Sequence, residues 1–149
     1  AAVVASFEPA LKLTGNSKRG LAVFQKACSS CHKHGKHGTR DLGPDLVTVA
    51  AHSPAKLLAN ILDPNRDIQP GYHAYHCELK NGEQLFGQVA GETASSITLR
   101  LADGSSRAIL RGELAELRSA EVSLMPEGLE EGLSLQEMAD LIAFVRGAL

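Results

Sequence analysis

Cys28-Ser29-Ser30-Cys31-His32 is the stretch of this sequence that says most about its fold and chemistry. Two cysteines three positions apart, followed directly by a histidine, form the C-x-x-C-H pattern that is typical of covalent attachment of a c-type haem. Each thiol can form a thioether with one haem vinyl group, and the histidine then becomes the proximal ligand of the iron. The pattern predicts one haem c held by Cys28, Cys31 and His32.

Other uses of this cysteine pair are less consistent with the chain. A structural zinc site needs four ligands, and the sequence has no second C-x-x-C. A thioredoxin-like pair follows a strand in an α/β pattern, whereas this pair ends a predicted helix. Zinc, a redox pair and chance remain as alternatives to haem. The third cysteine, Cys77, alternates with Tyr75 and Leu79 and is predicted to be a buried, inert thiol.

The composition is that of an ordinary globular protein. The chain has 149 residues, of which 44% are hydrophobic and 21% charged, with a formal net charge of −2. No basic patch with interleaved aromatic residues occurs, so nucleic-acid binding has no support. The apolar runs are far too short for a transmembrane segment. Because covalent haem attachment normally takes place outside the cytoplasmic membrane, we expect a periplasmic or otherwise extracytoplasmic location.

Helical patterns occur at both ends of the chain. Residues 1–16 are predicted to be mostly irregular, and a first helix is expected from Ser17 to about Cys28. Gly20 on that helix lowers helix stability, which makes sense if another helix crosses closely there. Ser53-Pro54 opens a second helix that ends before Pro64. The capping box Ser134–Glu137 opens the last one.

Between these helices the hydrophobic period changes from helical to alternating. Asn81-Gly82 and Asp103-Gly104 are strong hairpin turns, and alternating apolar residues flank each of them. Glu113–Arg118 is expected to add a short last element. The segment therefore predicts an antiparallel β-meander of about four strands, or a small barrel.

The helices and the haem motif together resemble a class I cytochrome c. The resemblance rests on Gly20, Phe24, the C-x-x-C-H motif, Leu42-Gly43-Pro44-Asp45-Leu46, Met125-Pro126 and Phe144. It implies a mainly α fold in which the first and last helices cross and a Gly-Pro loop covers the proximal side of the haem. It also implies that the carbonyl group of Pro44 accepts a hydrogen bond from His32, and that a methionine from a late loop is the distal ligand.

One spacing departs from that family. His32 and Met125 are 93 positions apart, and removal of the 47 residues 73–119 leaves 46, which the family does use. Residues 73–119 are therefore interpreted as a β-rich insertion in a single cytochrome c domain over residues 1–149, α+β overall. With this layout, residues 10–147 resemble the haem-binding cytochrome domain found at the C-terminus of large secreted proteins of planctomycetes and verrucomicrobia.

Met125 is the predicted distal ligand because it lies in a loop with Pro and Gly, whereas Met138 lies on an apolar helix stripe and is expected in the core. The histidines are rivals for the distal position, although His34 and His37 are expected to face solvent. The predicted haem-binding residues beyond the motif and Pro44 are apolar wall residues and two candidates for the propionates: Leu42, Leu46, Ile61 and Leu129, then Arg66 and Tyr72.

These features predict a one-electron carrier, not an enzyme, because His32 and Met125 would fill both axial positions of the iron. The expected partner is a fused or separate dehydrogenase. Two other classes remain open. One is a haem-based sensor or haem enzyme with a labile distal ligand. The other is an interaction module in which the haem is structural.

Overall fold

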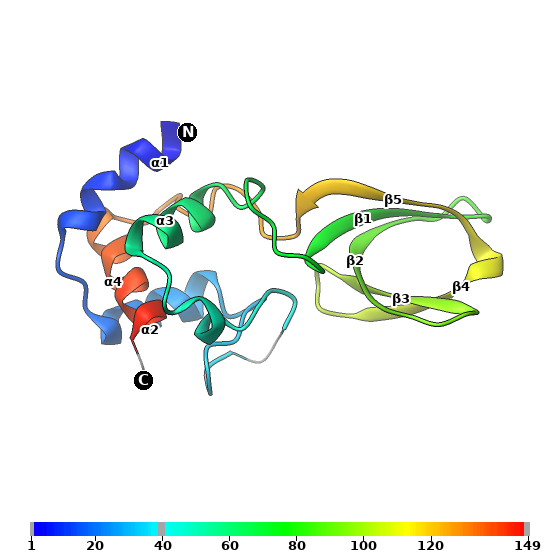
Figure 1. The fold of residues 1–149 in the computed structure, drawn as a ribbon, viewed down its shortest axis with the longest axis horizontal. Coiled ribbons are helices and arrows are strands. Elements are labelled where there is room, and N and C mark those ends of the chain that lie inside the picture. Colours follow the sequence, from blue (N-terminus) through cyan, green and yellow to red (C-terminus); the bar gives the residue numbers. More distant parts are fainter. Residues whose placement is uncertain (1, 39–40, 148–149) are drawn as a thin grey trace. The chain divides into compact units, whose positions relative to one another are not determined.

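The computed structural model describes residues 2–38 and 41–147 and divides the chain into two compact units. Unit 1 comprises residues 1–66 and 126–149, and unit 2 comprises residues 67–125. Figure 1 shows the helices in the first unit and the strands in the second. The predicted arrangement, a single domain with an insertion at 73–119, stays a prediction.

Unit 1 is helical. Its elements, in chain order, are α1 (Ala2–Phe7), η1 (Glu8–Lys12), α2 (Ser17–Ala27), η2 (Leu46–Val49), α3 (Pro54–Leu62) and α4 (Leu135–Arg146). The predicted caps of α3 and α4 are confirmed, since Ser53 caps α3 and Ser134 forms a capping box with Glu137. The prediction that residues 1–16 are mostly irregular is wrong, because α1 and η1 form there and bury Ala10 against the core.

The core of unit 1 forms where α2 and α4 cross. A Cβ atom at position 20 would overlap the backbone oxygen of Asp140 and lie 2.7 Å from the Cβ atom of Phe144. The rings of Phe24 and Phe144 lie 5.2 Å apart beside this point. The close crossing predicted at Gly20 is therefore confirmed, and only glycine lets the two backbones approach so closely.

Unit 2 is an antiparallel sheet in the order β4-β3-β2-β1-β5. Its elements are β1 (His73–Leu79), β2 (Gln84–Glu92), β3 (Ser96–Leu101), β4 (Ser106–Leu110), η3 (Arg111–Glu113) and β5 (Leu114–Ser123). Both predicted hairpin turns are present, with Gly82 and Gly104 at positive φ angles of 89° and 86°. The strands curve strongly (Figure 1) and enclose a second core of Cys77, Leu79, Ile97, Leu99 and Ile109.

The predicted mainly α fold class is wrong. Among the residues that the structure describes, 35% are helical and 27% lie in a five-stranded sheet. Helices and strands thus contribute comparable shares of the fold. Strand β5, which was expected as a short element at Glu113–Arg118, runs for ten residues along β1. Strand β5 is an edge strand whose pairing with β1 shifts register twice. Its buried and exposed residues therefore do not alternate regularly, so the hydrophobic pattern of the sequence did not reveal its full length.

Candidate haem-attachment site

The C-x-x-C-H motif lies directly after the end of α2. Cys28 is the C-cap residue of α2, and its amide makes the last regular hydrogen bond of the helix, to the carbonyl oxygen of Phe24 over 2.8 Å. The amides of Cys31 and His32 then both donate to the carbonyl oxygen of Cys28, over 3.1 and 2.9 Å. This tight turn holds the two thiols and the imidazole together on one short segment.

The imidazole of His32 is fixed by a backbone carbonyl group. Its Nδ1 lies 2.7 Å from the carbonyl oxygen of Pro44, so Nδ1 carries the proton and donates it. The other ring nitrogen, Nε2, then keeps the lone pair that a metal ion requires. The resemblance to class I cytochromes implied this contact, and the geometry agrees with it.

The environment also favours the neutral form of His32. Burial lowers the pKa of the imidazole, and this effect outweighs the opposing influence of the Pro44 carbonyl group and the Asp45 carboxylate. A neutral imidazole is the form that binds metal ions. His32 therefore has both the tautomer and the protonation state of an iron ligand.

Gly43 makes room for the His32 ring. A Cβ atom at position 43 would overlap the ring and lie 2.7 Å from Nδ1 and 2.8 Å from Nε2. The amide of Gly43 also donates to the carbonyl oxygen of Cys31 over 2.8 Å, which ties the loop to the motif. The sequence marked Gly43 only as part of a Gly-Pro loop, and its packing against the histidine emerges from the structure.

Both motif cysteines are free and half-buried. Burial, with a smaller contribution from the nearby Cys31, raises the pKa of the Cys28 thiol to about 11. Cys28 is therefore a protonated thiol at neutral pH and a weak nucleophile, which does not suit a thioredoxin-like redox role. An intact thiol is what thioether formation with a vinyl group consumes.

His34 has a role that the sequence did not reveal. It was expected to face solvent, but its side chain is 5% exposed, and its Nε2 lies 2.9 Å from the carbonyl oxygen of Val145 on α4. Its ring lies 4.7 Å from that of Phe144. The expectation that His34 faces solvent is therefore wrong. His37 was expected to face solvent as well, but it is half-buried, with its ring 5.7 Å from that of Phe144. His34 thus anchors the loop after the motif to the last helix.

A buried carboxylate ties the other end of α2 to α4. Asp140 is 2% exposed and accepts hydrogen bonds from the amide of Asn16 over 2.8 Å, from Arg19 over 2.9 and 3.2 Å, and from Gln136 over 3.0 Å. Burial alone would raise its pKa, but the hydrogen bonds from Arg19, Gln136 and Asn16 outweigh burial, so the pKa is lowered. The helix crossing next to the motif is therefore held by polar as well as apolar contacts.

The other predicted haem-binding residues are distributed over both units. In unit 1, Leu42 is buried, Leu129 is half-buried, Leu46 and Ile61 pack against the core, and Arg66 is exposed. Tyr72 and Met125 are half-buried and belong to unit 2, of which Met125 is the last residue. Of the whole predicted set, the structure brings together the motif residues and Pro44. The roles of the other residues stay predictions.

Two predictions about sulfur-containing side chains are confirmed. Met138 is fully buried in the core of unit 1, as its place on the apolar stripe of α4 indicated. Cys77 is 1% exposed inside the sheet, and burial raises the pKa of its thiol, although the charge of Arg107 opposes the shift. A buried, protonated thiol of this kind is inert.

Among residues 2–38 and 41–147, no three or more His, Cys, Asp and Glu side chains lie close enough together to hold a metal ion by themselves. Within the same ranges, every helix is too short or too polar to cross a membrane.

Comparison with known proteins agrees with this site. Residues 15–88 match the family described as Cytochrome C oxidase, cbb3-type, subunit III. The matched segment contains the C-x-x-C-H motif, the Gly-Pro loop and α3, and it supports a c-type cytochrome domain in this chain. Such a domain implies a covalently bound haem c and haem-based electron transfer. No curated protein matches the chain.

Proposed function

We propose that this chain is an electron-transfer cytochrome domain that holds one haem c through Cys28 and Cys31, with His32 as the proximal ligand. The observation that carries the proposal is the 2.7 Å contact between Nδ1 of His32 and the carbonyl oxygen of Pro44. This contact, together with the space left by Gly43, supports a fixed imidazole with Nε2 free for iron. The haem, when bound, supplies one-electron exchange between ferric and ferrous iron.

The protein residues around the motif then have defined tasks. Cys28 and Cys31 hold the group covalently, and the turn after α2 fixes their spacing. The Pro44 carbonyl group keeps His32 in one tautomer and raises its basicity as a ligand. His34 and Asp140 hold the motif loop and α2 to α4, which limits the movement of the ligand. A rigid site favours electron transfer because little needs to rearrange when the charge changes.

Met125 is proposed as the distal ligand. It is half-buried in a loop that continues into Pro126, whereas Met138, the only other methionine, is fully buried on α4. A thioether is a soft donor that favours ferrous iron and raises the reduction potential. With both axial positions occupied, the iron has no free position for a substrate. We therefore propose an electron carrier and not an enzyme.

The wider setting of the site is proposed from the sequence. Leu42, Leu46, Ile61 and Leu129 would form the apolar walls of the haem pocket, and Arg66 and Tyr72 would bind the propionates. Residues 1–149 would form one cytochrome domain with a β-rich insertion at 73–119, of the kind found in large secreted proteins of planctomycetes and verrucomicrobia. The electron donor would be a fused or partner dehydrogenase, and the location extracytoplasmic.

The experiment is an absorption spectrum of the oxidised and reduced holoprotein, for the wild type and for Met125→Ala, with Met138→Leu as the matched control. We expect a low-spin c-type spectrum with a weak sulfur-to-iron charge-transfer band. The band should be lost completely in Met125→Ala and kept in Met138→Leu, because Met138 only fills the core.

Other outcomes separate the parts of the proposal. A band that persists in Met125→Ala would remove Met125 as the ligand. A low-spin spectrum without the band would point to a histidine such as His52, whose Nδ1 is buried and has no hydrogen-bond partner among the described residues. A high-spin wild-type spectrum with rapid CO binding would replace electron transfer by sensing or catalysis. Absence of covalent haem would refute the proposal as a whole.

A further inference from the structure

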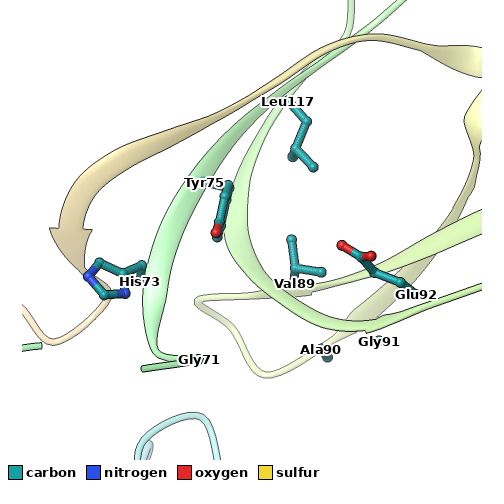
Figure 2. A pocket seen from close by; sticks show the side chains of 8 residues that line it. All are labelled: Gly71, His73, Tyr75, Val89, Ala90, Gly91, Glu92 and Leu117. Atoms are coloured by element: carbon teal, nitrogen blue, oxygen red, sulfur yellow. The ribbon is translucent and has the colours of Figure 1, made fainter. Parts of the chain in front are cut away.

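Unit 2 contains a cavity whose lining residues are not among those proposed to hold the haem. Its volume is about 340 Å³, which lies within the range of about 300–1,000 Å³ that is usual for small-molecule sites. Strands β1, β2 and β5 form its walls, and Figure 2 shows the side chains around it. The residues that line it are Gly71, His73, Tyr75, Val89, Ala90, Gly91, Glu92 and Leu117.

The residues directly opposite the aromatic wall of the cavity, on both neighbouring strands, are small. Tyr75 on β1 pairs with Gly87 on β2 and with Ser119 on β5. Both cross-strand partners are small, so neither can cover the ring of Tyr75. Val89 and Leu117 add apolar surface beside the ring (Figure 2). The cavity therefore offers one aromatic face and an apolar lining.

A carboxylate adds negative charge to the same space. Glu92 lines the same cavity as Tyr75, and Figure 2 shows its carboxylate directed toward Val89, on the side of Val89 away from Tyr75. The guanidinium group of Arg111 lies 3.6 Å from the carboxylate of Glu92. Both side chains are substantially exposed, at 60% for Glu92 and 44% for Arg111. The Nε of Arg111 donates to the carbonyl oxygen of Thr93 over 3.1 Å. The exposed ion pair is weak, so Glu92 can exchange this partner for another cation.

The net charge of unit 2 also favours the binding of a cation. Residues 67–125 contain eight acidic and five basic side chains, which gives unit 2 a formal net charge of −3. The 149-residue chain as a whole has a net charge of only −2. Unit 2 therefore attracts small cations rather than anions.

The backbone at the edge of the cavity leaves open space at one position, Gly91. Gly91 lies at a register shift between β2 and β3, and its φ angle lies outside the left-handed region. A Cβ atom at this position would meet no atom within 4 Å. The fold therefore does not require glycine here. Because Gly91 lines the cavity, a larger side chain can be introduced at its edge without a clash.

We propose that this cavity binds a small organic ammonium ion with an apolar body. The cation would lie against the ring of Tyr75 and be neutralised by Glu92, and the apolar body would contact Val89 and Leu117. An aromatic face with a nearby carboxylate is the combination that attracts ammonium groups, through cation–π and Coulomb interactions together. The inference does not depend on the haem function.

The test is isothermal titration calorimetry of the full holoprotein with benzyltrimethylammonium. This probe has no lone pair and cannot ligate iron, so binding should leave the haem spectrum unchanged. We expect saturable binding with a Kd of about 1 mM or tighter, and binding of benzyl alcohol and benzoate at least about tenfold weaker. Glu92→Gln and Gly91→Leu should each weaken binding by about tenfold or more, and Tyr75→Leu by about fivefold.

Two matched variants show whether such losses are specific. Arg111→Gln removes the same ion pair as Glu92→Gln but leaves the carboxylate, so it should keep or tighten binding. Gly112→Leu adds a side chain at another open glycine of unit 2, outside the cavity, and should leave binding unchanged. Equal binding of the three probes, full binding by Glu92→Gln, or no binding of benzyltrimethylammonium would each overturn the proposal.

Discussion

The two units of this chain build their interiors in different ways. In unit 2 the core follows from alternation along the strands, and Cys77, Ile97 and Leu99 are buried because they share one face of the sheet. In unit 1 the core depends on a few close approaches between segments far apart in sequence, such as Gly20 against Asp140 and His34 against Val145. The comparison teaches that the core of unit 2 depends on burial distributed along its strands, whereas the core of unit 1 also depends on close contacts between distant segments.

Gly20→Val should have the largest effect, because the new side chain would overlap the backbone of α4. Since a backbone cannot yield as a side chain can, we expect unit 1 to lose about 4 kcal/mol or more. Hydrogen exchange by mass spectrometry should show lost protection in α2 and α4 and normal protection in β1–β4. Ala22→Val on the exposed face of α2 should cost less than about 1 kcal/mol. Equal loss of protection in both units would show that they unfold together.

Leu99→Ala comes second and addresses the other unit. Leu99 is 0% exposed in the sheet core, so the truncation should cost about 3 kcal/mol. Urea denaturation followed by hydrogen exchange should place the loss in unit 2 and leave α2 and α4 protected. Leu110→Ala, at an exposed position on β4, is the control and should have little effect. If Leu99→Ala also removed protection from α2 and α4, the separation of the two units would be wrong.

Asp140→Asn should have the smallest effect of the three, about 2 kcal/mol at pH 7, because the charged acceptor of several hydrogen bonds becomes neutral. The pKa of Asp140 is lowered in the folded state, so its stabilisation is present above the unfolded pKa of about 3.9 and is lost as the pH falls through the folded value. The difference between wild type and variant should therefore shrink below about pH 4.

Urea denaturation at pH 7 and at pH 3 measures this difference. Glu116→Gln, at an exposed position on β5, is the control and should show no comparable pH dependence. If the difference in the free energy of unfolding between wild type and Asp140→Asn did not change with pH, the shape of the Asp140 side chain and not its charge would explain its role.

Much of the secondary structure was predictable because its signals are local. The caps at Ser53 and Ser134 and the turns at Gly82 and Gly104 depend on neighbouring residues, and all of them were predicted correctly. The helical start of the chain was missed because α1 and η1 are short, and it is Ala10 in η1 that becomes buried in the core. Strand β5 was underestimated because an edge strand with two register shifts has no regular alternation.

The candidate site also contains residues that local sequence signals revealed and residues that they did not. Cys28, Cys31 and His32 were evident from their spacing, and the contact of His32 with Pro44 followed from a family resemblance. The roles of His34 and Asp140 were not predictable. A histidine in a Gly-rich loop and an aspartate on an amphipathic helix are ordinary surface residues until another segment packs over them.

The sequence by itself indicated the chemistry that we propose for this protein, because the haem-attachment motif lies within five consecutive residues. It also determined the sheet turns and the caps of α3 and α4, which depend on the backbone preferences of a few neighbours. Only the tertiary structure decided the extent of the sheet, the burial of His34, the polar ties of Asp140 and the cavity beside Tyr75. The physical reason is that burial and partner choice depend on residues more than a hundred positions apart, such as His34 and Val145, which the folded chain alone brings together.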